Sequence, residues 1–253
     1  MKTRIISTTI PHIWVDTDNN ECTPDLFNAR LLTAEELTVY IARVSNPSNQ
    51  TNTDTAPKLL AYCIRNGHWS VFEHVHMTVE IETSLAIATQ ILRHRSFTFQ
   101  QFSQRYADVT KLGDVIEPVE LRAKAAGGNR QGSGESADNY MVPHTCYDAA
   151  EASSGAIRQS VKAYVELMSA GVAPESARFV LPQCTKTRLY MTGNLRSWIH
   201  YLTQRLDPHT QKEHREVAES ILVHFKRQFP MTYEACSSIE IPARTLFPKL
   251  AQP

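Results

Sequence analysis

The chain has 253 residues, enough to bury a full hydrophobic core in one large domain or two small ones. Its 26 basic and 26 acidic residues cancel, which argues against a general nucleic-acid binder because such proteins usually carry a basic excess. The five cysteines are widely spaced without a C-x-x-C pair, and no apolar run approaches the roughly 20 residues of a membrane span, so we expect a cytoplasmic protein with reduced thiols and no zinc motif.

The N-terminal part of the chain is predicted to form one strand and two helices. Enrichment in Ile and Thr predicts a strand over residues 3–10. The capping box Thr33-Ala-Glu-Glu36 predicts the start of a helix, which runs into a polar loop over 46–54. Pro57 suits the first turn of a second helix, and Asn66-Gly67 fits its C-terminal stop.

A half-buried strand and a third helix are predicted next. Apolar and polar residues alternate from Val75 to Glu82, which is the period of a strand with one buried face. Ser84 can cap a helix that delivers Arg93-His94-Arg95 at or near its C-terminus. A helix C-terminus favours cations, which accounts for His94 without any ligand but leaves the polar and aromatic residues after it unexplained.

Residues 123–139 are rich in glycine and serine and hold four of the nine glycines of the chain. This composition predicts a mobile surface segment, which can be interpreted as a domain linker or as an active-site lid. We favour an insertion within one domain, residues 1–253, because basic, carboxylate-free sequence lies on both sides of it.

The C-terminal half is predicted to contain three helices, with a short helix and a strand between the first two. Apolar spacing predicts a helix that includes 157–168, a short helix from Pro174 and a strand over 183–191. Asn194 can cap the next helix, and the last runs from Asp207-Pro208 to just before Pro230. Because helices predominate and do not alternate regularly with strands, we expect an α+β fold with a small, mainly antiparallel sheet.

Two windows without any Asp or Glu, residues 83–106 and 176–206, stand out from this neutral chain. The first contains Arg93, His94, Arg95 and Arg105 interleaved with four aromatic residues. Arginine forks match phosphate or carboxylate oxygens, so the mixture predicts a ligand with both a phosphate and a flat ring. The alternative is that the windows are ordinary solvated faces. G-x-G-x-x-G and Walker A patterns are absent, so any nucleotide is expected to be held by arginines.

Arg93-His94-Arg95, seven intervening residues and Ser103 resemble the signature of the flavin-dependent thymidylate synthases. Further segments fit that family in order and spacing from about 42 to 205, including Gly67-His68-x-Ser70-x-Phe72-Glu73-His74 and Asn194-x-Arg196-Ser197. The resemblance implies a homotetramer with active sites shared between subunits. It also implies FAD as cofactor, reductive methylation of dUMP to dTMP, methylenetetrahydrofolate as carbon donor and NADPH as reductant, without a covalent enzyme nucleophile.

The resemblance also implies roles for individual residues. The implied dUMP contacts are Gln90, Arg93, Gln101, Ser103, Arg105, Arg178 and Arg205. The implied contacts to FAD or folate are Ser45, His68, Ser70, Glu73, Arg93, His94, Arg95, Asn194, Arg196 and His200. Arg205 matches the arginine that favours ionisation at N3 of the uracil and is the implied catalytic residue. Gln101 stands where some members carry Glu, and His200 where some carry Asn.

A different class of function also fits an arginine-rich, aromatic surface. A non-catalytic nucleotide- or single-stranded RNA-binding module would use the phenylalanines for stacking and the arginines for phosphate. The neutral total charge disfavours this alternative. His68, His74 and His76 lack a familiar metal-ligand spacing, so no metal site is expected.

Overall fold

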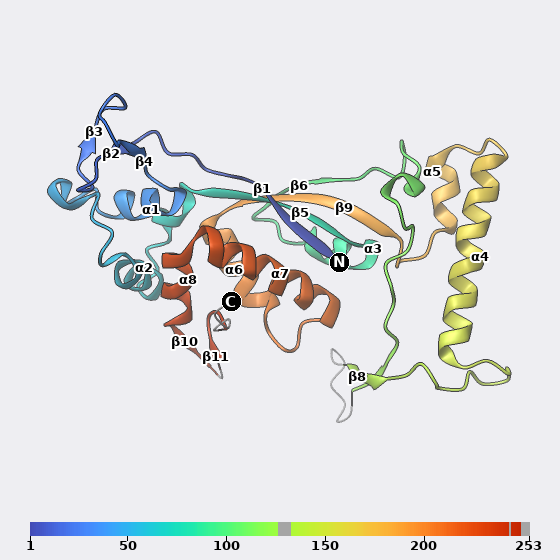
Figure 1. The fold of residues 1–253 in the computed structure, drawn as a ribbon. Coiled ribbons are helices and arrows are strands. Elements are labelled where there is room, and N and C mark those ends of the chain that lie inside the picture. The colour runs from blue at the N-terminus through green and yellow to red at the C-terminus, as the bar shows by residue number, and fades with distance from the viewer. Residues whose placement is uncertain (126–132, 243, 249–253) are drawn as a thin grey trace.

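A four-stranded antiparallel sheet forms the centre of the molecule, with helices on one of its faces (Figure 1). The computed structural model describes residues 1–125, 133–242 and 244–248. The strands lie in the order β1 (Lys2–Thr8), β5 (His76–Ser84), β9 (Lys186–Asn194) and β6 (Thr98–Gln101). The covering helices are α3 (Leu85–Ile91), α6 (Leu195–Arg205) and α7 (Lys212–Gln228). This mixture of helices with antiparallel strands confirms the predicted α+β class.

The buried face of the sheet follows from the alternation of apolar residues. Met77, Val79 and Ile81 of β5 are fully buried, as predicted. On β9, Leu189 lies opposite Ile81 and Met191 lies opposite Val79. A slip of one residue would turn all these side chains to the other face, so the hydrophobic pattern fixes the register.

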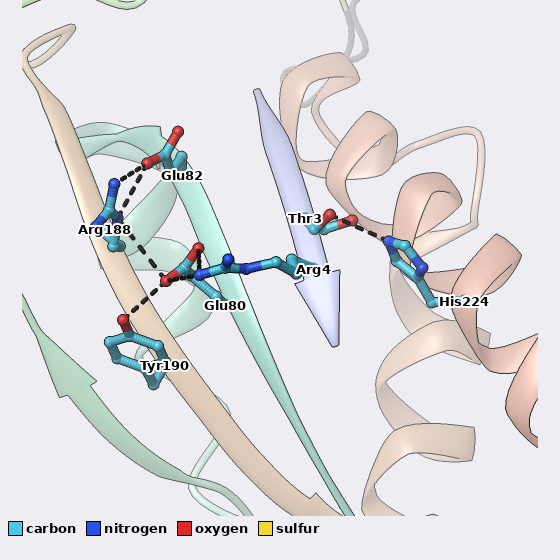
Figure 2. Close-up of polar contacts among 7 residues, drawn as sticks. All are labelled: Thr3, Arg4, Glu80, Glu82, Arg188, Tyr190 and His224. Atoms are coloured by element: carbon cyan, nitrogen blue, oxygen red, sulfur yellow. Dashed lines mark hydrogen bonds and ion pairs between the residues drawn. The ribbon is translucent and has the colours of Figure 1, made fainter. Parts of the chain in front are cut away.

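The opposite face of the sheet carries a ladder of charged and hydroxyl groups (Figure 2). Arg4 Nη2 donates to Glu80 Oε2 (3.0 Å), and the Tyr190 hydroxyl donates to the same oxygen (2.8 Å). Arg188 Nε donates to Glu82 Oε1 (3.0 Å). Burial would raise the pKa of the Glu80 carboxyl, but these donors outweigh it and hold that pKa below its usual range. The charges on this face are therefore already paired with one another.

The elements at one end of the sheet, on the left of Figure 1, come mainly from the N-terminal part of the chain. They are β2 (Trp14–Val15), β3 (Glu21–Cys22), β4 (Arg30–Leu31), α1 (Ala34–Ala42), η1 (Pro47–Asn49), α2 (Ala56–Arg65), η2 (Trp69–Glu73) and α8 (Pro230–Ser237). The predicted capping box is confirmed, because the Glu36 N–H donates to Thr33 Oγ1 (3.2 Å) and the Thr33 N–H donates to Glu36 Oε2 (2.7 Å). Gly67, at φ 72°, ends α2 as predicted.

The elements between β6 and β9 in the chain are η3 (Val109–Leu112), β7 (Arg122–Lys124), β8 (Ser133–Ser136), α4 (Ala149–Ser169), α5 (Pro174–Ala177) and η5 (Arg178–Val180). Helices α4 and α5 lie at the other end of the sheet, on the right of Figure 1, whereas η3 contacts β9. The predicted glycine-rich insertion over 123–139 contains β8 and most of β7, which pair with each other, and its residues 126–132 lie outside the described part of the chain. Helix α4 has the predicted amphipathic sequence, yet Tyr164 is its only buried residue.

Two sequence-based boundaries were wrong. The strand predicted over 183–191 lies at 186–194, because the Thr185 N–H and hydroxyl both bond the Pro182 carbonyl and make a turn there. The last long helix begins at Lys212, since the Asp207 carboxylate accepts the His209 N–H and forms a turn first. That helix ends at Gln228, just before Pro230 as predicted, but it is not the last helix, because Pro230 opens α8 (Pro230–Ser237).

Strand β6, which pairs with β9 in the central sheet, was not predicted. Near the C-terminus, β10 (Glu240–Ile241) pairs with β11 (Arg244–Thr245). Among the residues described, no helix combines the length and the apolarity needed to cross a bilayer.

Candidate active site

The arginine-histidine-arginine segment lies in the turn between α3 and β6. Ser84 caps α3 as predicted, its Oγ accepting the Ile87 N–H (3.4 Å). After the helix ends, the His94 N–H bonds the Ile91 carbonyl (3.0 Å), which draws His94 under the helix. His94 is consequently buried, whereas Arg93 and Arg95 are exposed. Within the described residues neither guanidinium group has a hydrogen-bond or ion-pair partner, so both are available to a ligand.

His94 and Arg205 form a hydrogen-bonded pair beneath that turn. Arg205 is the last residue of α6, and its Nε donates to His94 Nε2 at 2.8 Å. Burial, then the positive charge of Arg205 and the proximity of His200, lower the pKa of His94 to about 4. The ring is therefore neutral near pH 7, and because Nε2 accepts, its proton sits on Nδ1. His94 thus holds Arg205 in place while remaining uncharged itself.

A second buried histidine lies next to this pair. The His94 and His214 ring centroids are 6.3 Å apart. His214 Nε2 is 3.2 Å from the Tyr201 hydroxyl, and His214 Nδ1 is 3.2 Å from Gln90 Oε1. Gln90 Nε2 in turn donates to Gln211 Oε1 at 2.6 Å. Burial, then the charge of Arg205, lower the pKa of His214 to about 3.

Sequence reasoning missed Tyr201, Gln211 and His214. A signal for His214 was present, because it lies three and seven residues before Val217 and Ile221 on the buried stripe of α7. A polar residue at such a position is buried and must find hydrogen-bond partners.

The two buried histidines predict that the protein loses stability in mild acid. In the unfolded chain they bind protons near pH 6.5, whereas in the folded chain they do so only near pH 4 and pH 3. The unfolded state therefore holds more protons across this window, so the free energy of unfolding is unaffected above about pH 6.5 and falls as the pH drops below it. Glu35 acts in the opposite sense, since burial raises its pKa to about 6.

The contribution of His214 can be separated from that of the other titrating groups by comparing how the free energy of unfolding changes with pH in wild type and in a variant. Urea unfolding of wild type and His214→Gln should be followed at pH 7.0 and 5.5. Glutamine gains no proton, so the variant is expected to lose less unfolding free energy between the two pH values than wild type does. Equal losses would contradict the burial of a neutral His214.

A cavity of about 600 Å³ opens beside the first turns of α6. Its lining comprises Trp69, Glu73, Ser96, Asn194, Arg196, Ser197, Ile199, His200, Thr203 and Leu246. Arg196 is ion-paired with Glu73. The side chain of Asn194 accepts the Ser197 N–H (2.9 Å), which confirms the predicted cap of α6. We call Glu73, Asn194, Arg196 and His200 the α6 group; the structure brings these four predicted residues together around one cavity.

Two other predicted residues, Arg105 and Arg178, both contact Glu175 of α5 and are called the α5 group. Ser103 lies in the turn after β6, where its carbonyl accepts the Tyr106 N–H (3.2 Å). Arg105 Nη2 lies 3.4 Å from Glu175 Oε2, and Arg178 Nε donates to the Glu175 carbonyl (3.3 Å). Each guanidinium lies over the ring of the next residue, Tyr106 at 5.3 Å and Phe179 at 5.6 Å. Those rings are 78% and 82% exposed, so the cations and the flat rings form one open surface.

The α5 and α6 groups lie at opposite ends of β9. Arg178 comes before Lys186, where the strand begins, and Arg196 follows Asn194, where it ends. Nine strand residues rise about 26 Å at about 3.3 Å per residue. Among described residues, no hydrogen bond, ion pair or ring contact joins the two groups. A single protomer therefore does not bring all the predicted site residues to one small ligand.

The remaining predicted residues lie apart from the cavity beside α6. Gln101 Nε2 donates to Thr187 Oγ1 (3.2 Å), on the helix-covered side of the sheet. Ser45 lines a separate hollow of about 460 Å³. His68 packs edge-on against Tyr62 with ring centroids 5.8 Å apart, and Ser70 is exposed in η2. His68 and Ser70 flank Trp69, which does line the cavity.

Comparisons with known proteins agree in pointing to one family. Residues 29–231 match the family model described as thymidylate synthase complementing protein. A protein of Paramecium bursaria Chlorella virus 1, named probable flavin-dependent thymidylate synthase, is 45% identical over 203 residues, covering 80% of this chain and 90% of that protein. The flavin-dependent thymidylate synthase of Synechocystis sp. is 44% identical over 230 residues, covering 91% and 96%.

A solved structure shares the fold. The UMP/dUMP methylase of Streptomyces cacaoi, bound with 5-Br dUMP, superposes with a TM-score of 0.71 over 92% of this chain and 93% of that one. Its sequence identity to this chain is 24%.

Proposed function

The chain belongs to the family of flavin-dependent thymidylate synthases, and we propose on that basis that it converts dUMP to dTMP by reductive methylation. Methylenetetrahydrofolate supplies the carbon, NADPH the reducing equivalents, and FAD is the bound cofactor. The observation that carries the proposal is the pairing of Arg205 with the neutral, buried His94, within the family's Arg-His-Arg segment. This pair presents a fixed cation without a second positive charge beside it.

The cavity beside α6 has the residues that FAD would require. Trp69, Ile199 and Leu246 supply apolar walls for a flat ring system, and Arg196 and His200 supply polar groups at its margin. FAD held there would supply the hydride that reduces the transferred carbon to a methyl group. The residues of the chain position that cofactor, and Arg196 is held for this by its ion pair with Glu73.

Arg205 has the chemistry needed to activate uracil. Burial raises the pKa of the Cys63, Cys184 and Cys236 thiols, so these cysteines stay protonated and are poor nucleophiles. Without an enzyme nucleophile, C5 of the uracil must gain electron density through charge. A guanidinium near N3 or O4 stabilises the uracil anion and so makes C5 nucleophilic.

The α5 group supplies the charges expected at the phosphate end of dUMP. Arg105 and Arg178 both contact Glu175, Arg105 through its carboxylate and Arg178 through its backbone carbonyl. The carboxylate that pairs with Arg105 can be displaced by a phosphate, which offers more acceptor oxygens. The exposed rings of Tyr106 and Phe179 extend this surface. Because the group lies far from the cavity beside α6, we infer that one site combines residues of different subunits.

The surface of α4 supports a homotetramer. Ile157, Val161 and Met168 are only partly covered, and Val165 is 44% exposed. An apolar stripe on a 21-residue helix is normally covered. A second copy of the chain would bury it, which is the arrangement that a site shared between subunits requires.

The proposed redox function is tested by a visible absorption spectrum. Purified protein is mixed with FAD and dUMP, passed through a desalting column and examined before and after anaerobic addition of NADPH. A retained oxidised flavin spectrum that bleaches is the expected result. If no flavin is retained, the flavin-dependent assignment fails, and salt-dependent binding of single-stranded RNA would support the binding-module alternative.

Replacement of Arg178 by alanine is expected to weaken dUMP binding by about 1–3 kcal/mol, because a charge-assisted hydrogen bond to phosphate is lost. Calorimetry on the FAD-loaded protein measures the change. Arg227→Ala, an exposed arginine on α7 outside both groups, is the control and should bind dUMP normally. Native affinity in Arg178→Ala would remove this arginine from the site.

A further inference from the structure

Four side chains from different elements form one hydrogen-bonded chain beside the His94–Arg205 pair. The order is Tyr201, His214, Gln90 and Gln211, linked at 3.2, 3.2 and 2.6 Å. Tyr201 and His214 have no exposed surface at all. The chain therefore leads from the closed core to Gln90, which is partly exposed in α3.

The donor and acceptor of each hydrogen bond in this series follow from the buried Tyr201 hydroxyl. Within the described residues, His214 is the only hydrogen-bond partner of the Tyr201 hydroxyl. A buried hydroxyl that accepted from His214 would leave its own hydrogen without an acceptor, so Tyr201 donates to His214 Nε2. Burial lowers the pKa of His214 to about 3, so the ring is neutral and carries one hydrogen. That hydrogen is on Nδ1, which donates to Gln90.

These hydrogen bonds also fix the orientation of the Gln90 amide. Since Oε1 accepts from His214, the nitrogen Nε2 is on the other side and directs one hydrogen to Gln211. The second amide hydrogen has no acceptor among the residues described. A free glutamine amide can turn by half a rotation and exchange its oxygen for its nitrogen. In this protein the hydrogen bond from His214 selects one of the two orientations of the Gln90 amide.

We propose that His214 is a positioning residue that fixes the Gln90 amide as a hydrogen-bond donor toward an oxygen of dUMP. This inference rests on the proposed function and on the dUMP contact that the family resemblance implies for Gln90. Packing alone does not require a histidine at this place, since the other inward positions of α7 hold Val217, Ile221 and Leu222. What histidine adds there is its pair of hydrogen bonds.

The test measures dUMP binding to the FAD-loaded protein by calorimetry, in His214→Leu, Tyr201→Phe, Gln90→Ala and the double variant Gln90→Ala/His214→Leu. His214→Leu is expected to weaken dUMP binding about three- to tenfold, the range of one neutral hydrogen bond. Tyr201→Phe keeps the ring and the fold but removes the hydroxyl that sets the direction, so it should weaken binding in the same sense. His224→Leu on the same helix, whose Nε2 bonds the Thr3 carbonyl, is the matched control.

The double variant separates positioning from general damage. If His214 acts through Gln90, the double variant binds dUMP no more weakly than Gln90→Ala alone. Fully additive losses, or native affinity in both His214→Leu and Tyr201→Phe, would overturn the proposal. Should wild type itself fail to bind dUMP, the proposed function fails instead, so the two failures are distinguishable.

Discussion

Arg205→Ala is expected to lower the rate of dTMP formation by about 10²–10³-fold, the scale of losing one donor that stabilises developing negative charge. The uracil anion would lose the cation that stabilises it. Flavin should still bind, because the α6 group does not include Arg205. Turnover is measured under saturating substrates, and the visible spectrum reports the bound cofactor.

Controls distinguish charge from shape at this position. Arg205→Lys keeps the charge but loses the planar fork whose Nε bonds His94, so it should recover only part of the rate. Arg227→Ala changes an exposed arginine on α7 and should leave the rate intact. Wild-type dTMP formation by Arg205→Ala would exclude Arg205 as the residue that activates uracil.

Mixing two impaired variants is expected to restore activity. Arg178→Ala and Arg205→Ala each damage every site of a homotetramer. If Arg178 and Arg205 of one site come from different subunits, random mixed tetramers of equal parts contain intact sites, about one quarter of the total. The variants are co-expressed, and the mixed tetramers are assayed at a low dUMP concentration, where Arg178→Ala alone is nearly inactive.

The control is a second mixture, in which the two altered residues belong to the same protomer at each site. His94 and Arg205 contact each other within one protomer, so mixing His94→Leu with Arg205→Ala should create no intact site. Restored activity in both mixtures would point to simple stabilisation of one variant by the other. No restoration in either mixture would contradict a site shared between subunits.

Local sequence signals predicted the helix starts well. The caps at Thr33, Ser84 and Asn194 act within a few residues, and all three were found where they were predicted. Strand β6 and helix α8 depend on distant partners instead. β6 exists because it pairs with β9, and α8 packs on α2, so neither could be inferred from periodicity alone.

The predicted apolar stripe of α4 is a second case in which periodicity alone does not identify the packing partner. Its spacing indicates a face that must be covered, and only Tyr164 is buried within the chain. Periodicity does not reveal whether the cover comes from the same chain or from another copy. The structure of one protomer shows that most of the stripe is not buried by the same chain.

The site was predicted in part. Motif spacing predicted Glu73, Asn194, Arg196 and His200, and these residues share one cavity. The ligand contacts assigned to these residues stay predictions. The separation of the α5 group follows from the length of β9, which the sequence placed three residues too early. His214 escaped notice because its position on α7 follows the apolar spacing of the core, so its polar contacts became visible only through the tertiary structure.

Conversion of dUMP to dTMP can be followed through the transferred carbon. The FAD-loaded protein is incubated with dUMP, NADPH and methylenetetrahydrofolate carrying ¹³C in the methylene group, and the nucleotides are analysed by mass spectrometry. We expect dTMP with ¹³C in its methyl group, formed only when NADPH is present. Recovery of unchanged dUMP from protein that retains FAD and oxidises NADPH would contradict the proposed function.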